Sequence, residues 1–322
     1  MSTNSIDGML VEWGDRLFYG SNRIVRGDPP RLSLHAQAGA VRRRIHAIVV
    51  RRAPQVMVKV TGGGRGMAAI AAHLRYISKS GRLAFEDDRG EVRQGGDELR
   101  DLADQWRFGG ARIPENSKRR EAFNIMLAMP AGTNPEVVLS AAREFAKAEL
   151  SNHRYVMVLH THQANPHVHL AVRAEGRDGR RLSPRKQDLR RWREVFAEKL
   201  RDHGIEAEAT SKVVRGSRHR NERLWQRKAR AYGHSRDRGA DAAGAKLTPS
   251  RRQAAQAWCE IAKALASSDD KADRELGRSV VDYARWLPGV RYKGPDKQPQ
   301  RELPGFDRTP PQRTRTGPTW ER

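Results

Sequence analysis

The chain has 322 residues and a formal net charge of +24, because 62 lysines and arginines outnumber 38 acidic residues. This excess favours a polyanionic partner such as nucleic acid, while the single cysteine, Cys259, excludes an internal disulfide or a cysteine-based zinc finger. No stretch approaches the roughly 18 apolar residues of a membrane-spanning helix, and residues 1–8 lack the pattern of a secretory signal, so we expect a cytoplasmic protein with no membrane partner.

Residues 1–52 are expected to be an N-terminal extension, and we find no chemistry in them. After these residues the sequence predicts a strand at Val56–Val60, a glycine-rich turn at residues 61–66 and a helix at Met67–Ile77. Tyr76 stands at the end of this helix beside Arg75 and Lys79, whose positive charge favours an anionic phenol oxygen. It is therefore a candidate nucleophile, although any of the six tyrosines can serve only to pack.

Strands and helices continue to alternate along the next hundred residues. A hairpin is predicted at Phe85–Gly96 and a short helix at Leu99–Trp106. A strand follows at Phe123–Met129, and a longer helix runs from Pro135 to about Leu150. Asn134 is expected to cap the longer helix, since its side chain can accept from free amide groups of the first turn.

Four histidines then crowd into ten residues, at positions His160, His162, His167 and His169. Tyr155–His162 and His167–Arg173 alternate like two strands of a hairpin, in which residues two apart share a face. With Gln163–Pro166 as the turn, His162 lies opposite His167 and His160 opposite His169, so all four rings converge. One or two of them can simply pack or bind backbone, but clustered imidazoles are typical ligands of a transition metal.

Such a cluster predicts catalysis rather than a structural metal site. Three imidazoles leave other coordination positions of a divalent metal open, and open positions are typical of catalytic sites. In a chain this basic, we expect the metal to polarise a phosphodiester oxygen. The nucleophile is then water or a side chain, and attack by Tyr76 would form a phosphotyrosyl ester and leave a 3′ hydroxyl for later resealing.

The rest of the chain is expected to be helical and basic. A helix from Ser183 and Pro184 to about His203 carries an apolar stripe of Leu189, Trp192, Phe196 and Leu200. The strand-and-helix domain spans 53–210, and 211–287 is expected to be a basic helical DNA-binding extension. Its segment 211–238 holds ten lysines or arginines, which favours phosphate contact over a merely solvated face. Helices are predicted at Gln253–Ser267 and Asp273–Trp286, and a disordered tail at 288–322.

These motifs resemble those of the relaxase/mobilisation nuclease family, the conjugative DNA relaxases of the HUH endonuclease superfamily. The stretch His160-Thr-His-Gln-Ala-Asn-Pro-His167-Val-His169 is similar to the family's third motif. The segment from Gly62 to Gly81, with Tyr76, resembles its first motif, and residues 124–133 with the following helix resemble its middle segment. The resemblance covers about residues 55–215 and implies an α+β fold with a central antiparallel sheet flanked by helices.

The resemblance also implies roles for individual residues. Tyr76 becomes the nucleophile, and the ligands of a divalent cation such as Mg²⁺ or Mn²⁺ become His160, His167 and His169. Many family members have an aspartate where this chain has His162, so the proton acceptor for Tyr76 is open among His162, Asp87 and Asp88. His162 can instead be the third ligand. An all-nitrogen set suits Mn²⁺, Zn²⁺ or Ni²⁺ better than Mg²⁺.

The implied function is nicking of single-stranded DNA at a transfer origin, attachment to the 5′ phosphate and resealing, with accessory relaxosome proteins and a coupling protein as partners. The residues expected to bind the DNA are Arg75, Lys79, Arg190, Arg191, Lys212 and Arg215. Trp106, Trp192 or Trp225 can stack a base, although core packing is the better assignment. The alternatives are a non-catalytic DNA-binding accessory protein of a mobile element and a metal-dependent nuclease that uses water.

Overall fold

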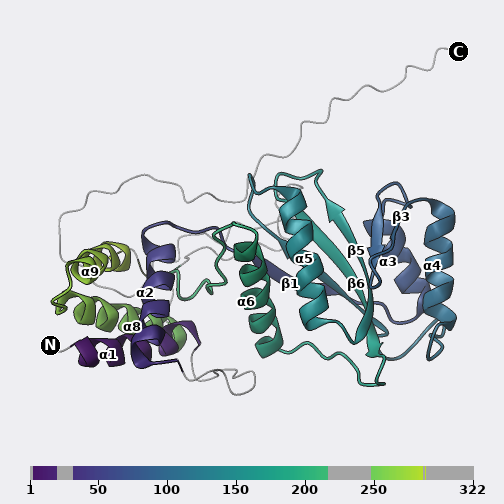
Figure 1. Ribbon diagram of the computed structural model, residues 1–322. Coiled ribbons are helices and arrows are strands. Elements are labelled where there is room, and N and C mark those ends of the chain that lie inside the picture. Colours follow the sequence, from purple (N-terminus) through teal and green to yellow (C-terminus); the bar gives the residue numbers. More distant parts are fainter. Residues whose placement is uncertain (1–2, 20–31, 217–247, 286, 288–322) are drawn as a thin grey trace, which may run out of the picture. The chain divides into compact units, whose positions relative to one another are not determined.

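The computed structural model describes residues 3–19, 32–216, 248–285 and 287. These residues fall into two compact units (Figure 1). We call Pro54–Ala209 the sheet unit, and we call the described residues of Met1–Ala53 and Thr210–Lys297 the helical unit. Every helix in the described ranges is too short or too polar to cross a lipid bilayer.

A six-stranded antiparallel sheet organises the sheet unit. Its strands are β1 (Met57–Gly62), β2 (Phe85–Asp87), β3 (Val92–Arg93), β4 (Ala122–Ala128), β5 (His153–His160) and β6 (His167–Gly176). They lie in the order β1-β4-β6-β5-β2-β3, and each neighbouring pair is antiparallel. The expected α+β fold with a central antiparallel sheet is confirmed, and β6 lies inside the sheet with β4 and β5 as its neighbours.

Four helices flank this sheet: α3 (Met67–Ile77), α4 (Gly96–Phe108), α5 (Pro135–Glu149) and α6 (Lys186–Asp202). Asn134 caps α5 as predicted, because its side-chain oxygen accepts from the Glu136 amide at 2.9 Å. The predicted start of α6 at Ser183 and Pro184 is wrong. The helix begins at Lys186. The Asp188 carboxylate accepts from the amide of the N-cap residue Arg185 at 2.9 Å, and this amide has no acceptor within the helix itself.

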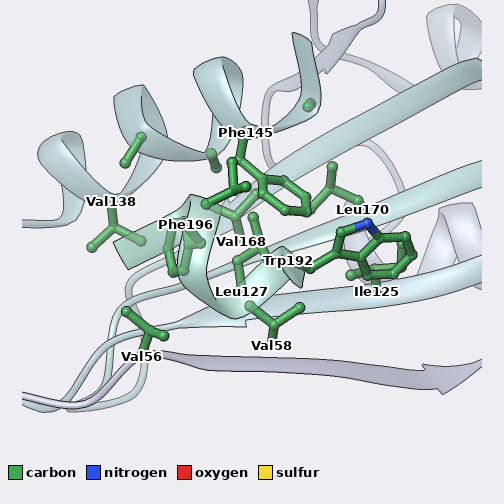
Figure 2. Close-up of a cluster of buried hydrophobic side chains, with 14 of the residues drawn as sticks. Val56, Val58, Ile125, Leu127, Val138, Phe145, Val168, Leu170, Trp192 and Phe196 are labelled. Atoms are coloured by element: carbon green, nitrogen blue, oxygen red, sulfur yellow. The ribbon is translucent and has the colours of Figure 1, made fainter. Parts of the chain in front are cut away.

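One face of the sheet is apolar and is covered by α5 and α6. Figure 2 shows Phe145 of α5 and Trp192 and Phe196 of α6 packed over strand residues such as Leu127 and Leu170. Burial of a large apolar side chain of this kind stabilises the fold by about 1.5–3 kcal/mol. Trp192 is 1 % exposed, so it packs in the core and does not present a face for a base.

The opposite face is covered by α3 and α4. Leu74 and Ile77 of α3 and Trp106 of α4 are buried in one cluster with the strand residues Val156 and Val158. Trp106 is therefore a second core residue, whereas Trp225 lies outside the described residues. The strands β4, β5 and β6 thus supply alternate side chains to two separate apolar clusters, as the period of two requires.

The helical unit comprises α1 (Thr3–Phe18), α2 (Leu34–Val49), α8 (Pro249–Ala266) and α9 (Lys271–Ala284). The helices predicted at Gln253–Ser267 and Asp273–Trp286 are confirmed in α8 and α9, with shifted ends. The two helices within residues 1–52 were not predicted. They share one buried core with α8 and α9, and the Arg42 guanidinium binds both Asp7 and Asp273 at 2.7 Å. Most of the basic segment (217–238) and the predicted tail (288–322) lie outside the described residues.

Candidate functional site

The histidine hairpin has a different register from the predicted one. His160 ends β5 and pairs directly with His167, the first residue of β6, while His169 lies opposite Val158. The loop therefore spans residues 161–166, and the predicted pairing of His162 with His167 is wrong. Pro166 has no amide hydrogen and cannot extend the ladder; its carbonyl oxygen instead accepts from the Met129 amide at 3.1 Å.

The three histidines on the strands nevertheless share one face of the sheet. The register differs by an even number of residues, which preserves the face on which side chains point. The ring centroids of His160 and His169 are 4.6 Å apart, and both are 5.1 Å from that of His167. One ring nitrogen from each histidine lies within 4.8 Å of the others, so these three side chains form a cluster of metal-ligand size.

Backbone carbonyl groups orient two of these imidazoles. Nε2 of His160 donates to the Ile77 carbonyl oxygen at 2.6 Å, and Nδ1 of His167 donates to that of Asn165 at 2.9 Å. Because a carbonyl group can only accept, these contacts assign the proton to those nitrogens and leave the other ring nitrogen with a free lone pair. Metal-binding histidines are typically held in this way by their second nitrogen.

The third histidine, His169, is half-buried in the same cluster. Burial, reinforced by the neighbouring imidazoles, lowers the pKa of His169 to about 3, so this ring is neutral near pH 7. Burial also lowers the pKa of His160. Nδ1 of His169 is buried and has no hydrogen-bond partner among the described residues. Neutral imidazoles with an unpaired buried nitrogen fit a divalent metal ion, which would be held by His160, His167 and His169.

His162 lies beside this triad and outside it. It sits in the exposed loop, with its ring centroid 5.0 Å from that of His160. The group of possible ligands that the structure brings together is His160, His167 and His169, without His162. The end of α3 is close to this loop, because the Ile77 carbonyl oxygen is bonded to His160, the neighbour of His162. Partial burial and the nearby charge of Lys79 lower the pKa of His162.

Tyr76 lies in the last turn of α3 and is 72 % exposed. The next residue, Ile77, is buried and gives its carbonyl oxygen to His160. The end of the helix is thus bonded directly to a residue of the histidine triad. Tyr76 and the histidines belong to separate motifs in the sequence, and the fold brings α3 and the triad to the same face of the sheet.

The chain leaves α3 through an unusual turn. Lys79, Ser80 and Gly81 have φ angles of 50°, 60° and 84°, so two residues with side chains occupy the left-handed region. The buried Ser78 hydroxyl stabilises this turn, because it donates to the Leu74 carbonyl oxygen at 2.8 Å and accepts from the Gly81 amide at 3.0 Å. Gly81 is required, since a Cβ atom there would lie 2.4 Å from the Gly95 carbonyl oxygen.

Two residues of this region were missed in the sequence analysis. The His73 ring is stacked 6.3 Å from that of Tyr76, burial lowers its pKa, and its Nε2 is buried without a hydrogen-bond partner in the described ranges. Ser78 fixes the turn described above. The i to i+3 spacing of His73 and Tyr76 is a signal that they can lie together on the helix, but no sequence signal identifies Ser78.

The predicted DNA-binding residues divide into two groups. Arg75 and Lys79 are exposed next to Tyr76. Arg190 and Arg191 lie on α6, the helix that covers the opposite face of the sheet, and Arg191 binds the Glu149 carboxylate at 2.9 Å. The remaining two, Lys212 and Arg215, belong to the helical unit.

The two aspartates considered as proton acceptors are engaged elsewhere. Asp87 lies opposite Val156, in the middle of β5 rather than at its histidine end, and accepts from Arg93 at 3.0 Å. Asp88 accepts from Arg177 at 2.6 Å. Asp87 is on the same sheet face as the triad, because it lies opposite Val156, but Val156 is four residues from His160 along β5. Both carboxylates are bound by arginines near β2.

The fold and the site together define a class of protein: an α+β domain with a histidine triad fit for a divalent metal beside an exposed tyrosine. A comparison with protein-family models matches residues 76–205 to the family described as Relaxase: MobA/VirD2-like, nuclease domain. The sheet unit therefore contains a nuclease domain of the relaxase/mobilisation family, a family of DNA-nicking proteins. No curated protein matches the chain.

Proposed function

We propose that the protein nicks single-stranded DNA at a transfer origin by transesterification and later reseals it, with Tyr76 as the nucleophile. The observation that carries the proposal is the hydrogen bond from His160 to the Ile77 carbonyl oxygen, because it joins the helix of the tyrosine to the histidine triad. The exposure of Tyr76 supports the same conclusion, since a phenol that must reach a DNA phosphate cannot be buried.

In the proposed reaction, the Tyr76 oxygen attacks the phosphorus of a phosphodiester and the bond from phosphorus to the 3′ oxygen breaks. The phenol loses its proton, and the departing 3′ oxygen gains one. The products are a 5′ phosphotyrosyl ester and a free 3′ hydroxyl, and attack by a 3′ hydroxyl on that ester reverses the reaction. Arg75 and Lys79, on either side of Tyr76, provide positive charge for the phosphates next to the reacting one.

His160, His167 and His169 would hold the divalent cation, which supplies a Lewis acid that polarises a phosphodiester oxygen. Mg²⁺ and Mn²⁺ are the ions implied by the resemblance, and three imidazoles suit Mn²⁺ better than Mg²⁺. The exposed His162 stays our candidate for the proton acceptor, because it lies beside the triad and is not one of the grouped ligands. Accessory relaxosome proteins and a coupling protein are the further partners that we expect.

The test is a denaturing gel of the full chain incubated with Mn²⁺ and labelled single-stranded DNA that carries the transfer origin. We expect a labelled band at protein size with the wild type and none with Tyr76→Phe. Tyr19→Phe is a matched control in the helical unit, and it should leave the covalent band unchanged.

Two other results would support the alternative functions. Cleavage without a covalent band, unchanged in Tyr76→Phe, would indicate a nuclease that uses water. Binding of DNA without cleavage in any metal would indicate a non-catalytic accessory protein. The first result would overturn the role of Tyr76, and the second would overturn catalysis altogether.

A further inference from the structure

His73 lies between the tyrosine and the histidine triad. It stands one turn before Ile77, beside the buried stripe by which α3 packs on the sheet. That stripe shares a hydrophobic cluster with Val158, the residue directly opposite His169 in the sheet. The rings of His73 and His169 are near enough for a charge on His73 to lower the pKa of His169. On its other side, the His73 ring is stacked 6.3 Å from that of Tyr76.

The imidazole of His73 carries an unsatisfied polar atom. Its Nε2 is buried and has no hydrogen-bond partner among the residues that the structure describes. Such an atom makes folding less favourable, because it loses its contacts with water and gains no other partner. A leucine or a phenylalanine would fill the same place without this cost. Packing alone therefore does not account for a histidine here, and the buried nitrogen calls for a specific partner.

The triad contains the matching unsatisfied atom. Ring nitrogens of His160 and His167 are fixed by backbone carbonyl oxygens, whereas Nδ1 of His169 is buried and has no partner within the described ranges. Histidines that bind a metal usually donate the N–H of their second ring nitrogen to such a partner. His73 can be this partner, because burial lowers its pKa and a neutral ring has one nitrogen that accepts.

We propose that His73 is a positioning residue: its Nε2 accepts a hydrogen bond from Nδ1 of His169, and its ring supports the ring of Tyr76. One bond satisfies both buried nitrogens and leaves Nε2 of His169 for the metal ion. The two atoms are not bonded to each other in the structure, so we expect the bond to form when His169 turns toward the ion. The inference rests on the proposed function, and it links the nucleophile to the triad through one side chain.

Two substitutions in the full chain separate the nitrogen of His73 from its ring. His73→Phe keeps a ring beside Tyr76 and removes the nitrogen, whereas His73→Gln keeps an oxygen that can accept and removes the ring. Affinity for Mn²⁺ is measured by titration calorimetry without DNA. We expect binding to be about tenfold weaker in His73→Phe, the lower end for loss of such a partner. The affinity of His73→Gln should stay near that of the wild type.

The second readout is the rate at which the covalent band forms in a single turnover at saturating Mn²⁺. His73→Phe should retain this rate, because the metal is bound and a ring still supports Tyr76. His73→Gln should form the band severalfold more slowly, because an exposed tyrosine without a stacked neighbour can occupy several rotamers. A merely structural role would not lower affinity in one variant and rate in the other.

His153→Phe is the matched control. His153 is also a buried imidazole of the sheet unit, but its Nδ1 is bonded to the Arg173 carbonyl oxygen at 3.1 Å. This substitution should lower the urea midpoint and leave the Mn²⁺ affinity unchanged. His73→Phe should instead keep or raise the urea midpoint without metal, because it removes an unsatisfied atom. If His73→Phe fails to fold, the smaller His73→Leu replaces it in the affinity measurement.

The same measurements separate this inference from the proposed function. Unchanged affinity in His73→Phe would overturn the bond to His169, and so would an equal loss in His73→Gln. An unchanged rate in His73→Gln would overturn the support of Tyr76. Either failure would leave transesterification intact if the wild type forms the covalent band. Without any band in the wild type the role of Tyr76 would be overturned, while the Mn²⁺ affinities would still decide the bond between His73 and His169.

Discussion

The two faces of the sheet are built from the same strands and have different tasks. Along β6, Val168, Leu170 and Val172 point to the face under α5 and α6, where they are part of the larger hydrophobic cluster. The residues that alternate with them at the start of β6, His167 and His169, point to the other face, which carries a smaller apolar cluster. A strand of period two can thus stabilise the fold with one set of residues and leave the other set free for chemistry.

The largest expected difference between the faces is in stability. Phe145→Ala removes a ring that contacts Trp192 and Phe196 on the apolar face. It should lower the free energy of unfolding by about 3–5 kcal/mol, measured by urea denaturation. Phe108→Ala, the same change at a site that is 61 % exposed, should cost less than about 1 kcal/mol. Equal losses in the two variants would contradict this description of the core.

On the other face, the histidines should contribute to metal binding and little to stability. We expect His167→Ala to lower the affinity for Mn²⁺ about 100-fold, since loss of even an outer-shell partner costs about 10–100-fold. Without metal, the free energy of unfolding should fall by no more than about 1.5 kcal/mol, the value of one hydrogen bond.

Titration calorimetry and urea denaturation measure these two quantities. His162→Ala is the control, and it should retain the affinity because His162 is outside the grouped ligands. A loss of several kcal/mol in metal-free His167→Ala, with no change in affinity, would mean that these rings only pack.

The turn after Tyr76 should be the next most sensitive feature. Ser78→Ala removes a buried hydroxyl and leaves the Gly81 amide without the acceptor that it now has. We expect a loss of about 1–3 kcal/mol in the free energy of unfolding and a lower yield of the covalent band. Ser151→Ala, at an exposed position, should change neither quantity. An unchanged yield in Ser78→Ala would show that the turn does not position the tyrosine.

The smallest expected effect is at the start of α5, above the apolar face. Asn134→Ala removes the side-chain cap of the helix and should cost about 1 kcal/mol, seen as a lower urea midpoint with unchanged affinity for Mn²⁺. Asn134→Asp should keep the stability, because a carboxylate can accept the same hydrogen bond. A change in metal affinity would mean that the two faces are not independent.

Local patterns predicted much of this domain. The helix Met67–Ile77 has the predicted ends, and Trp192, Phe196 and Leu200 form the buried side of α6 as their spacing requires. The face of the histidines also followed from alternation. The register of the two strands did not follow from alternation, because alternation fixes only the face of the sheet to which a side chain points. The length of the loop depends instead on contacts at the end of β4, such as the hydrogen bond between the Met129 amide and the Pro166 carbonyl oxygen.

Features that depend on distant segments were not predicted. Ile6 and Leu10 have helical spacing, but their core partners include Trp258 near the other end of the chain. Similarly, the contact between His160 and the Ile77 carbonyl group arises only when α3 packs on the sheet. No local pattern encodes a tertiary contact of this kind. The tyrosine and histidine motifs could therefore be identified from the sequence, whereas the contact between them could not.

The hydrogen bond between His160 and Ile77 has a consequence for the order of folding. His160 and His167 are joined by the short loop 161–166, so the histidine triad can form within a local hairpin, which closes quickly. The helix α3 reaches the triad across a separation of 83 residues in the chain, and such long-range contacts form late. Tyr76, the proposed nucleophile, is therefore expected to join the triad last, so that a partly folded chain would have the proposed metal ligands in place before the tyrosine that we propose attacks DNA.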